Sequence, residues 1–383
     1  MISSTKQRYY FDNAATTPID PQVLEAMMPY LQTNFGNPSS IHSHGREVRS
    51  AIEKARKTVA NLLNCSTSEI FFTSGGTEAD NTAIINSVIK YDIKQAITSK
   101  IEHHAVLHTL QSLENQGVLQ VSYVNLDEKG NVDLVHLEQL LAKNEKSIVS
   151  LMHGNNEIGN LIDFGQLSEI CNRYNTVLHS DTVQTMGHYV HDLQKMNTDF
   201  IVGAAHKFHG PKGVGFLYIN GNLKIEPYLH GGSQERNMRG GTENVYGIIG
   251  LAKALEIAYE GMESHQKHIE KLKVKLRDGL SSKIPNITFN GESADLDKSL
   301  YTVLNVSFPP MEEADMLLFN LDINKISASG GSACTSGSNI GSHVLTAIGV
   351  SPYRPSVRFS FSKYNTEAEV DYLIEKVGEI IEV

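Results

Sequence analysis

The sequence EIFFTSGGTEADNTAIINSVIK, residues 69–90, joins an apolar run to a helix-like segment through a glycine-rich turn. Residues 69–73 predict a short buried strand, residues 74–76 a turn, and residues 79–90 a helix. A strand that leads through a tight turn into a helix is the typical repeating unit of α/β proteins. This stretch therefore predicts an α/β fold class.

The same alternation continues on the carboxyl side of this unit. Strands are predicted at residues 96–99, 118–125, 147–152, 176–179 and 199–204, and helices at 104–114, 134–142 and 164–174. Strands that alternate with helices favour parallel pairing, because each helix carries the chain back to the start of the next strand. We therefore expect one α/β domain with a mostly parallel sheet.

The last third of the chain has a different pattern. It predicts a long helix at 245–280, strands at 284–290 and 302–308, a helix at 312–320, a Gly/Ser-rich loop at 327–341, a strand at 357–362 and a final helix. Thr366 and Glu369 form the start signal of that final helix, a capping box. We expect a large domain over residues 15–260 and a small α+β domain built from residues 1–14 and 261–383.

Composition limits the function and the compartment. The 383 residues include 33 Lys and Arg against 43 Asp and Glu, and the resulting net charge of −10 disfavours direct binding to nucleic acid or to anionic membranes. No apolar run has the length of a membrane span, and the first residues lack the apolar core of a signal peptide. Cys65, Cys171 and Cys334 contain no C-x-x-C pair, which argues against a disulfide framework and structural zinc. We therefore expect a cytoplasmic protein.

Two polar residues follow apolar strands in the middle of the chain. Lys207 comes just after the strand at 199–204, and Asp181 just after the strand at 176–179. Ligands of open α/β sheets bind outside the carboxyl ends of the strands, so both residues can reach one site. A partly buried lysine can form a Schiff base, and an acid beside a pyridine ring keeps that ring protonated, as pyridoxal phosphate requires. Each residue alone also fits a plainer role, as an exposed turn lysine or a helix-capping aspartate.

A phosphate site and a histidine cluster are further candidates. Gly76 and Thr77 begin a helix, where backbone N–H groups and a hydroxyl can hold a phosphate, although the turn matches neither a Walker A loop nor a dinucleotide fingerprint. His103 follows a strand and could lie flat on an aromatic cofactor. His104 and His108 are spaced like a helical metal pair, but no third ligand is near, so we expect surface histidines and no metal site.

The cysteines and one arginine complete the candidates. Cys334 lies in SGGSACTSGS, residues 329–338, with no large apolar neighbour. An exposed cysteine on such a loop suits a nucleophile that travels between a buried substrate and an outside acceptor. Cys65 and Cys171 are expected to be packing residues. Arg358 stands alone in an apolar strand, where it could bind a substrate carboxylate or form a structural ion pair.

A series of motifs resembles those of the cysteine desulfurases, which belong to the class V aminotransferase-like group of fold-type I pyridoxal phosphate enzymes. The motifs span most of the chain in order: FDNAATTP (11–18), NFGNPSSIHSHGR (34–46), TSGGTEADN (73–81), EHHAVL (102–107), NNEIG (155–159), HSDTVQ (179–184), AAHKFHGPKG (204–213), RGGTEN (239–244), SGGSACTSGS (329–338) and SVRFS (356–360). The resemblance implies a fold-type I transferase with a mostly parallel, seven-stranded type of sheet and a small α+β domain. The long cysteine loop is similar to that of the group serving iron–sulfur cluster assembly and tRNA thiolation.

The resemblance also implies a role for each matching position. Lys207 would hold pyridoxal 5'-phosphate covalently, Asp181 would pair with its ring nitrogen, and His103 would stack on the ring and serve as an acid–base group. Cys334 would take the sulfur of the substrate. The other positions would bind the cofactor oxygen or the substrate (Gln184, Asn156), the phosphate (Gly76, Thr77, His206 and, from a partner subunit, Thr242) and the substrate carboxylate (Arg358, Asn34).

The implied activity is the conversion of L-cysteine to L-alanine by a homodimer, with the sulfur passed from a persulfide on Cys334 to acceptor proteins. A selenocysteine lyase, another class V aminotransferase and a non-enzymatic scaffold remain alternatives. Transamination needs no cysteine, and a scaffold needs neither Lys207 nor Asp181, so these residues disfavour the last two. Ala204 departs from the family, which usually has serine there in contact with the phosphate, and this puts the cofactor affinity in doubt.

Overall fold

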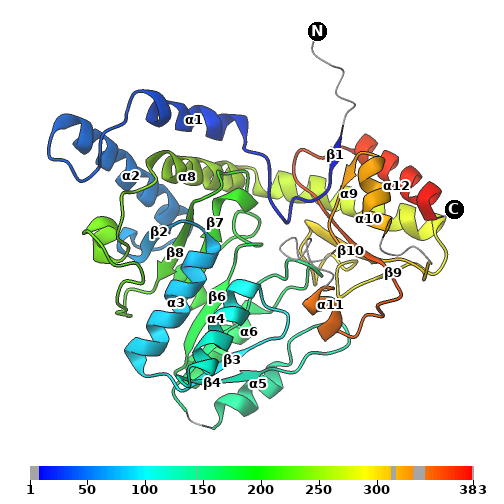
Figure 1. The fold of residues 1–383 in the computed structure, drawn as a ribbon, viewed down its shortest axis with the longest axis horizontal. Helices are drawn as coiled ribbons and strands as arrows, with labels where there is room; N and C mark the ends of the chain where they lie inside the picture. The colour runs from blue at the N-terminus through cyan, green and yellow to red at the C-terminus, as the bar shows by residue number, and fades with distance from the viewer. Residues whose placement is uncertain (1–7, 144, 312–315, 331–340, 382–383) are drawn as a thin grey trace.

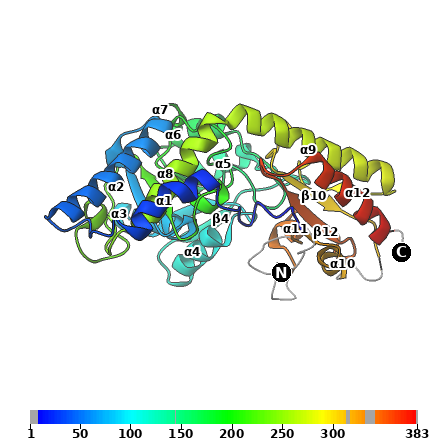
Figure 2. The same ribbon diagram turned by 90° about the horizontal axis from the view of Figure 1, so that it is seen from above.

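The computed structural model describes residues 8–143, 145–311, 316–330 and 341–381. These residues form a large sheet and a small sheet, which lie on opposite sides of the molecule in Figure 1. Helix α9 (Met262–Lys283) runs alongside the small sheet and continues the chain from α8 (Val245–Glu260), which packs beside the large one (Figure 2).

The large sheet has seven strands. Their order across the sheet is β2 (Ile70–Thr73), β8 (Gly215–Ile219), β7 (Phe200–Ala204), β6 (Val177–Asp181), β5 (Ser147–Ser150), β3 (Gln95–Thr98) and β4 (Gln120–Tyr123). All neighbouring pairs are parallel except those of β8, which is antiparallel to both β2 and β7. The α/β class and the mostly parallel sheet predicted from the sequence are confirmed.

Helices cover both faces of the large sheet. Successive strand residues point to opposite faces, so Ile97 and Val149 join one apolar cluster while Ala96 and Ile148 join another. The first cluster packs against α1 (Pro21–Gln32), α2 (Ser43–Leu62), α5 (Leu134–Leu141), α6 (Phe164–Arg173), α7 (Leu193–Met196) and α8. The opposite face packs against α3 (Gly76–Tyr91) and α4 (His104–Asn115). Burial on both faces explains why these strands are almost continuously apolar.

The small sheet is antiparallel, in the order β12 (Ser356–Ser360), β10 (Val303–Ser307) and β9 (Thr288–Phe289). Helices α9 and α12 (Glu367–Ile381) bury their apolar faces in its core, which also takes in Phe11. A separate parallel pair joins β1 (Tyr9–Tyr10) to β11 (Ile326–Ser327). The remaining short elements are α10 (Leu317–Ile323), α11 (His343–Ala347) and the 3-10 turns η1 (Thr67–Glu69), η2 (Ala205–Lys207) and η3 (Gln234–Asn237).

Two predicted elements were wrong in extent, and several elements were not predicted, among them strands β1, β8 and β11 and helices α1 and α2. The helix predicted at 245–280 is two helices, since the chain breaks at Gly261, a residue with low helix propensity. The strand predicted at 284–290 shrinks to Thr288–Phe289, because Pro285 lacks an N–H and Asn286 has a φ of 60°. Strand β8 follows a Gly-Pro-Lys-Gly turn and was not predicted.

Other local predictions were correct. The capping box of α12 is formed, because the Thr366 N–H donates to Glu369 Oε2 at 2.9 Å and the Glu369 N–H donates to Thr366 Oγ1 at 3.3 Å. Cys171 is buried and Cys65 is half-buried against the large core, as expected of packing residues. Across the described ranges, no helix combines the length and the apolar character that a membrane crossing requires.

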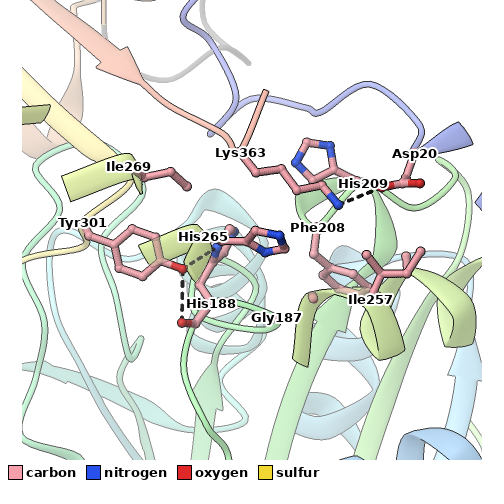
Figure 3. A pocket seen from close by; sticks show the side chains of 12 residues that line it. Asp20, Gly187, His188, Phe208, His209, Ile257, His265, Ile269, Tyr301 and Lys363 are labelled. Carbon is pink, nitrogen blue, oxygen red and sulfur yellow. Dashed lines mark hydrogen bonds and ion pairs between the residues drawn. The ribbon is translucent and has the colours of Figure 1, made fainter. Parts of the chain in front are cut away.

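An ion pair links the segment after β12 of the small sheet to the loop before α1. It lies beside a cavity of about 20 Å³ (Figure 3). Lys363 Nζ donates to Asp20 Oδ2 at 2.7 Å, and the Tyr364 hydroxyl donates to the same oxygen at 2.6 Å. Burial alone would raise the pKa of Asp20, but hydrogen bonds from Lys363, Tyr364 and the Gln22 N–H, together with the charge of Lys363, outweigh it and lower the pKa to about 2. The ionised form of Asp20 therefore stabilises the contact between the two sheets.

We expect Lys363→Met to lower the free energy of unfolding at pH 6 by about 2 kcal/mol, the contribution of a hydrogen bond to a charged group. Because the folded-state pKa of Asp20 is depressed, this stability is present above pH 4 and is lost as the pH falls toward 2. Urea unfolding should therefore show a smaller difference between variant and parent at pH 3 than at pH 6. Lys376→Met, which removes a solvent-screened i,i+3 pair with Glu379, should have a much smaller effect at either pH. An equal cost for both variants would contradict the prediction.

Candidate active site

A cavity of about 250 Å³ opens at the carboxyl ends of the parallel strands, the edge at which open α/β sheets bind ligands. The cavity is lined by residues at or after the ends of β2, β3, β5, β6 and β7, by part of the N-terminal segment and by one residue of the small sheet. These residues are Ala14, Ala15, Gly76, Thr77, Asp80, His103, Met152, Gly154, Asn156, Asp181, Val183, Gln184, Ala204, His206, Lys207 and Arg358. Most of the site residues predicted from the sequence therefore share one cavity.

Lys207 and Asp181 reach this cavity from adjacent strands. Asp181 ends β6, and Lys207 ends the turn that follows β7. The Lys207 amine donates hydrogen bonds to the carbonyl oxygens of Ala14 and Ala15, at 2.5 and 2.9 Å. Asp181 Oδ1 accepts from the Val183 N–H at 2.9 Å, which fixes the direction of the carboxylate. An amine and an oriented anion thus face the same space.

The N-terminus of α3 supplies an anion site on another part of the wall. The first-turn N–H groups of a helix have no partner within the helix and carry the positive end of its dipole. Gly76 begins α3, and a Cβ at this position would lie 2.9 Å from Val183 Cγ2. Glycine therefore allows the helix end to approach the β6 loop closely. Together with the Thr77 hydroxyl, this helix end has the chemistry to hold a phosphate.

His103 is oriented by the helix that it precedes. It is the N-cap of α4, and its Nδ1 accepts from the Ala105 N–H at 3.1 Å. Burial lowers the pKa of His103, so the imidazole is neutral at pH 7 and carries its proton on Nε2. In this state the ring can donate a hydrogen bond from Nε2.

Arg358 forms the structural ion pair that the sequence allowed, and it also reaches the cavity wall. It lines the cavity, yet it is only 1% exposed, and its Nη2 donates to Asp12 Oδ1 at 2.9 Å in an ion pair. Its Nη1 donates to the backbone oxygen of Asn156 at 2.8 Å. Its Nε is buried without a hydrogen-bond partner among the described residues. The guanidinium is thus held in place at the cavity wall.

Other predicted residues have different surroundings. Gln184 donates from Nε2 to the Ala14 carbonyl at 3.0 Å, and burial lowers the pKa of His206 to about 4. Asn34 and Thr242 do not line this cavity. Thr242 is exposed at a separate cavity of about 140 Å³. Cys334 lies outside the described residues.

His104 and His108 form a hydrogen-bonded pair, as their i,i+4 spacing allows. His104 Nδ1 and His108 Nε2 are 3.1 Å apart. The ring of His343, at the start of α11, packs on His104 with centroids 4.5 Å apart. These contacts give the pair a structural explanation.

Asp80 and Asp12 are the residues that the sequence reasoning missed. Asp80 follows Gly76 by four positions on α3, a spacing that puts both on one helix face, and this signal was available in the sequence. Asp12 lies shortly before Ala14 and Ala15, which line the cavity. Its partner Arg358 is 346 residues away in the sequence. No local pattern could have predicted that pairing.

The family model for class V aminotransferases matches residues 9–373. The chain therefore belongs to the class V aminotransferase family. A protein named cysteine desulfurase IscS from Clostridium botulinum is 43% identical over 380 residues, which cover 98% of this chain and 94% of the relative. A protein of the same name from Methanosarcina thermophila is 44% identical over 386 residues, 100% of this chain and 94% of the relative. A solved structure of a NifS-like protein matches with a TM-score of 0.90 at 40% identity, over 98% of this chain and 100% of that one. Within the family, the chain is a pyridoxal phosphate-dependent cysteine desulfurase.

The cavity fits this cofactor. A phosphate needs backbone donors and close approach, which the N-terminus of α3 offers because Gly76 has no Cβ. A pyridine nitrogen needs an anion, and Asp181 provides a buried carboxylate. An aldehyde needs an amine, and Lys207 is the lysine on the cavity wall. Ala204 lines the cavity but offers no hydroxyl to a phosphate.

We expect Gly76→Ala to weaken cofactor binding about tenfold or more, because the added methyl would force the start of α3 away from Val183. The measurement is an absorbance titration of apoenzyme with pyridoxal phosphate. Gly165→Ala, on α6, places a methyl group near only the Asp163 side chain and should leave the affinity unchanged. Unchanged affinity in Gly76→Ala would show that the helix start does not hold the phosphate.

Proposed function

We propose that this chain desulfurates L-cysteine to L-alanine with the residues of the described cavity and that Cys334 receives the sulfur as a persulfide. The observation that carries the proposal is the convergence of Lys207, Asp181, His103 and the α3 N-terminus on one cavity. When bound, pyridoxal phosphate supplies an electron sink that makes the C–S bond of the substrate labile.

The residues of the cavity support a role for each in holding the cofactor. The backbone N–H groups of Gly76 and Thr77, the Thr77 hydroxyl and His206 would hold the phosphate, and Asp181 would pair with the ring nitrogen. Lys207 would hold the cofactor covalently, and Gln184 and Asn156 would contact the ring oxygen or the substrate. The neutral His103 would stack on the ring and donate a hydrogen bond from Nε2.

Substrate handling uses Lys207 a second time. Its amine would also remove the proton from the α-carbon of the substrate and return a proton to the product. Arg358 binds the substrate carboxylate in its planar fork, with Asn34 as a second contact. The Cys334 thiolate would attack the sulfur of the substrate, so that an S–S bond forms while the C–S bond breaks, and its electron pair stays with carbon, which takes a proton to give alanine. An acceptor protein for iron–sulfur cluster assembly or tRNA thiolation would then take the outer sulfur of the persulfide.

The other two cysteines are poorly suited to this step. Burial, with a smaller contribution from Asp199, raises the pKa of Cys171 to about 12, and burial together with Glu69 raises the pKa of Cys65 to the same value. Neither thiol is a thiolate at neutral pH, and the thiolate is the nucleophile. This exclusion supports Cys334 as the sulfur carrier.

We expect Cys334→Ala to reduce alanine formation from L-cysteine by about 100-fold or more, since no nucleophile remains to take the sulfur. Cys65→Ala should keep the parental rate. The assay measures alanine release, and labelled sulfur shows which proteins of a cell extract receive the persulfide. Full sulfur transfer by Cys334→Ala would exclude the assigned nucleophile, and a higher rate on selenocysteine than on cysteine would favour a lyase.

We further propose that two copies of the chain form a homodimer in which Thr242 completes the phosphate site of the partner subunit. Thr242 is exposed and does not line the cavity of its own chain. Two ion pairs anchor its segment, Arg56 with Glu235 and Arg239 with Glu78. On and after α1 large apolar side chains are exposed, a feature typical of interaction surfaces: Leu24, Met28, Leu31, Phe35 and Ile41.

A mixed dimer tests this arrangement. Chains with Lys207→Ala and chains with Thr242→Glu are each expected to bind the cofactor poorly. A heterodimer of the two has one intact site if Thr242 serves the partner, so its cofactor content should recover to about one site per dimer. No recovery would place Thr242 in the site of its own chain or outside both sites.

The division into a unit of residues 15–260 and a unit of residues 1–14 and 261–383 is part of the same proposal. The apolar cluster around the large sheet draws its buried residues from Val23 to Leu255. The cluster around the small sheet draws its buried residues from Phe11 and from Ile269 onward. Separate cores support two units that meet at the cavity.

A further inference from the structure

Asp80 is a carboxylic acid in the cavity wall that the proposed function does not use. It lies on α3, one helical turn after Gly76, and is 1% exposed. Its side chain lines the same cavity as Asp181 and His103. One donor atom from each of these three residues lies within 4.8 Å of the other two.

Two buried carboxyl groups at this distance are not both ionised without a large cost, unless cations compensate them. Burial, followed by the charges of Asp181 and Glu102, raises the pKa of Asp80 well above its usual value. Burial raises the pKa of Glu102 to about 8, so this second acid is itself largely protonated at pH 7. Burial and the nearby Asp181 carboxylate thus favour a proton on Asp80.

The basic neighbours do not reverse this preference. Burial lowers the pKa of His179 to about 3, and burial also lowers the pKa of His103, so both imidazoles are neutral at pH 7. Lys207 and Arg358 also line the cavity: the Lys207 amine donates to the Ala14 and Ala15 carbonyls, and the Arg358 guanidinium is paired with Asp12. The basic side chain within ion-pair distance of Asp80 is His179, whose imidazole is neutral.

His179 lies next to Asp80. Its Nε2 is 3.2 Å from Asp80 Oδ1, and its Nδ1 is 2.8 Å from Ser150 Oγ. Asp80 Oδ1 and His179 Nε2 are both buried, and neither has a hydrogen-bond partner in the part of the chain that the structure describes, so their contact lacks hydrogen-bond geometry. A buried carboxylate oxygen without a hydrogen-bond donor disfavours the ionised form, which again favours a proton on Asp80.

We propose that Asp80 is a protonated carboxylic acid at neutral pH and donates a hydrogen bond to the Asp181 carboxylate, directly or through one bridging water. A separation of up to 4.8 Å allows either form. The two carboxyl groups then carry a single negative charge, which resides on Asp181. Asp80 is therefore a positioning residue, because it acts on the cofactor ring only through Asp181. This inference rests on the role proposed for Asp181.

The test uses holoenzyme with Asp80→Asn and Asp80→Ala. An amide is neutral, has the shape of the protonated acid and donates a hydrogen bond, so Asp80→Asn should keep kcat/KM within about threefold and leave its pH profile unchanged. Asp80→Ala lacks the donor and should lose about tenfold in kcat/KM. It should also shift the pH at which the visible absorbance of the bound cofactor changes.

An infrared difference spectrum between the parent and Asp80→Asn gives a readout that does not depend on activity. At pH 7 it should contain the C=O stretching band of one protonated carboxyl group. Asp163→Asn, which replaces an exposed N-cap carboxylate on α6, should show only ionised carboxylate bands. The proposal is overturned if the difference spectrum of Asp80→Asn contains carboxylate bands alone, or if Asp80→Asn loses as much activity as Asp80→Ala.

Asp181→Asn separates this inference from the proposed function. If Asp181→Asn kept the parental activity and cofactor spectrum, the role of Asp181 would be wrong, whereas the infrared band would still report whether Asp80 holds a proton. If Asp80→Ala fails to fold, the comparison of parent and Asp80→Asn still decides the protonation state.

Discussion

The parallel pairing of β6 with β7 is the contact on which the cavity depends. In this register Asp181 is opposite Val202, so the two strands end at the same edge and deliver Asp181 and Lys207 to one space. Side chains alternate between the faces of a sheet, and a slip of one residue would turn Asp181 toward the opposite face. Packing on both faces prevents such a slip, because it would exchange the buried side chains of the two faces and break their fit against the covering helices.

The N-terminal segment connects this edge to the small sheet. Its first residues pair with β11, and the Asp12 carboxylate accepts from Arg358 and from Ser329. A few residues later, the carbonyls of Ala14 and Ala15 accept from Lys207. One short stretch of chain thus contacts groups from both sheets, and its backbone forms part of the cavity wall.

The sequence predicted the features that depend on local patterns. Strand and helix alternation is a local signal, and the parallel strands of the large sheet were found where it placed them. The helix break at Gly261 lies inside a continuous amphipathic pattern, so the sequence did not predict it. Strand β8 follows β7 through a turn and not through a helix, so the alternation of strands and helices did not predict it either. The motifs around Lys207, Asp181 and Gly76 pointed to one cavity because each follows a strand. The pairing of Asp12 with Arg358 and the burial of Asp80 arise from packing between distant segments, which a single sequence does not encode in any local pattern.

Arg358 is already neutralised by Asp12 before a substrate arrives. Under its proposed role, binding is an exchange of one carboxylate for another at the same guanidinium, and the total charge beside the guanidinium changes little. Such an exchange gives weak attraction at long range and leaves discrimination to the fit of two oxygens at short range. If Arg358 has its proposed role, Asp12 is an internal competitor for the substrate, and the affinity for the substrate carboxylate is the difference between two similar contacts.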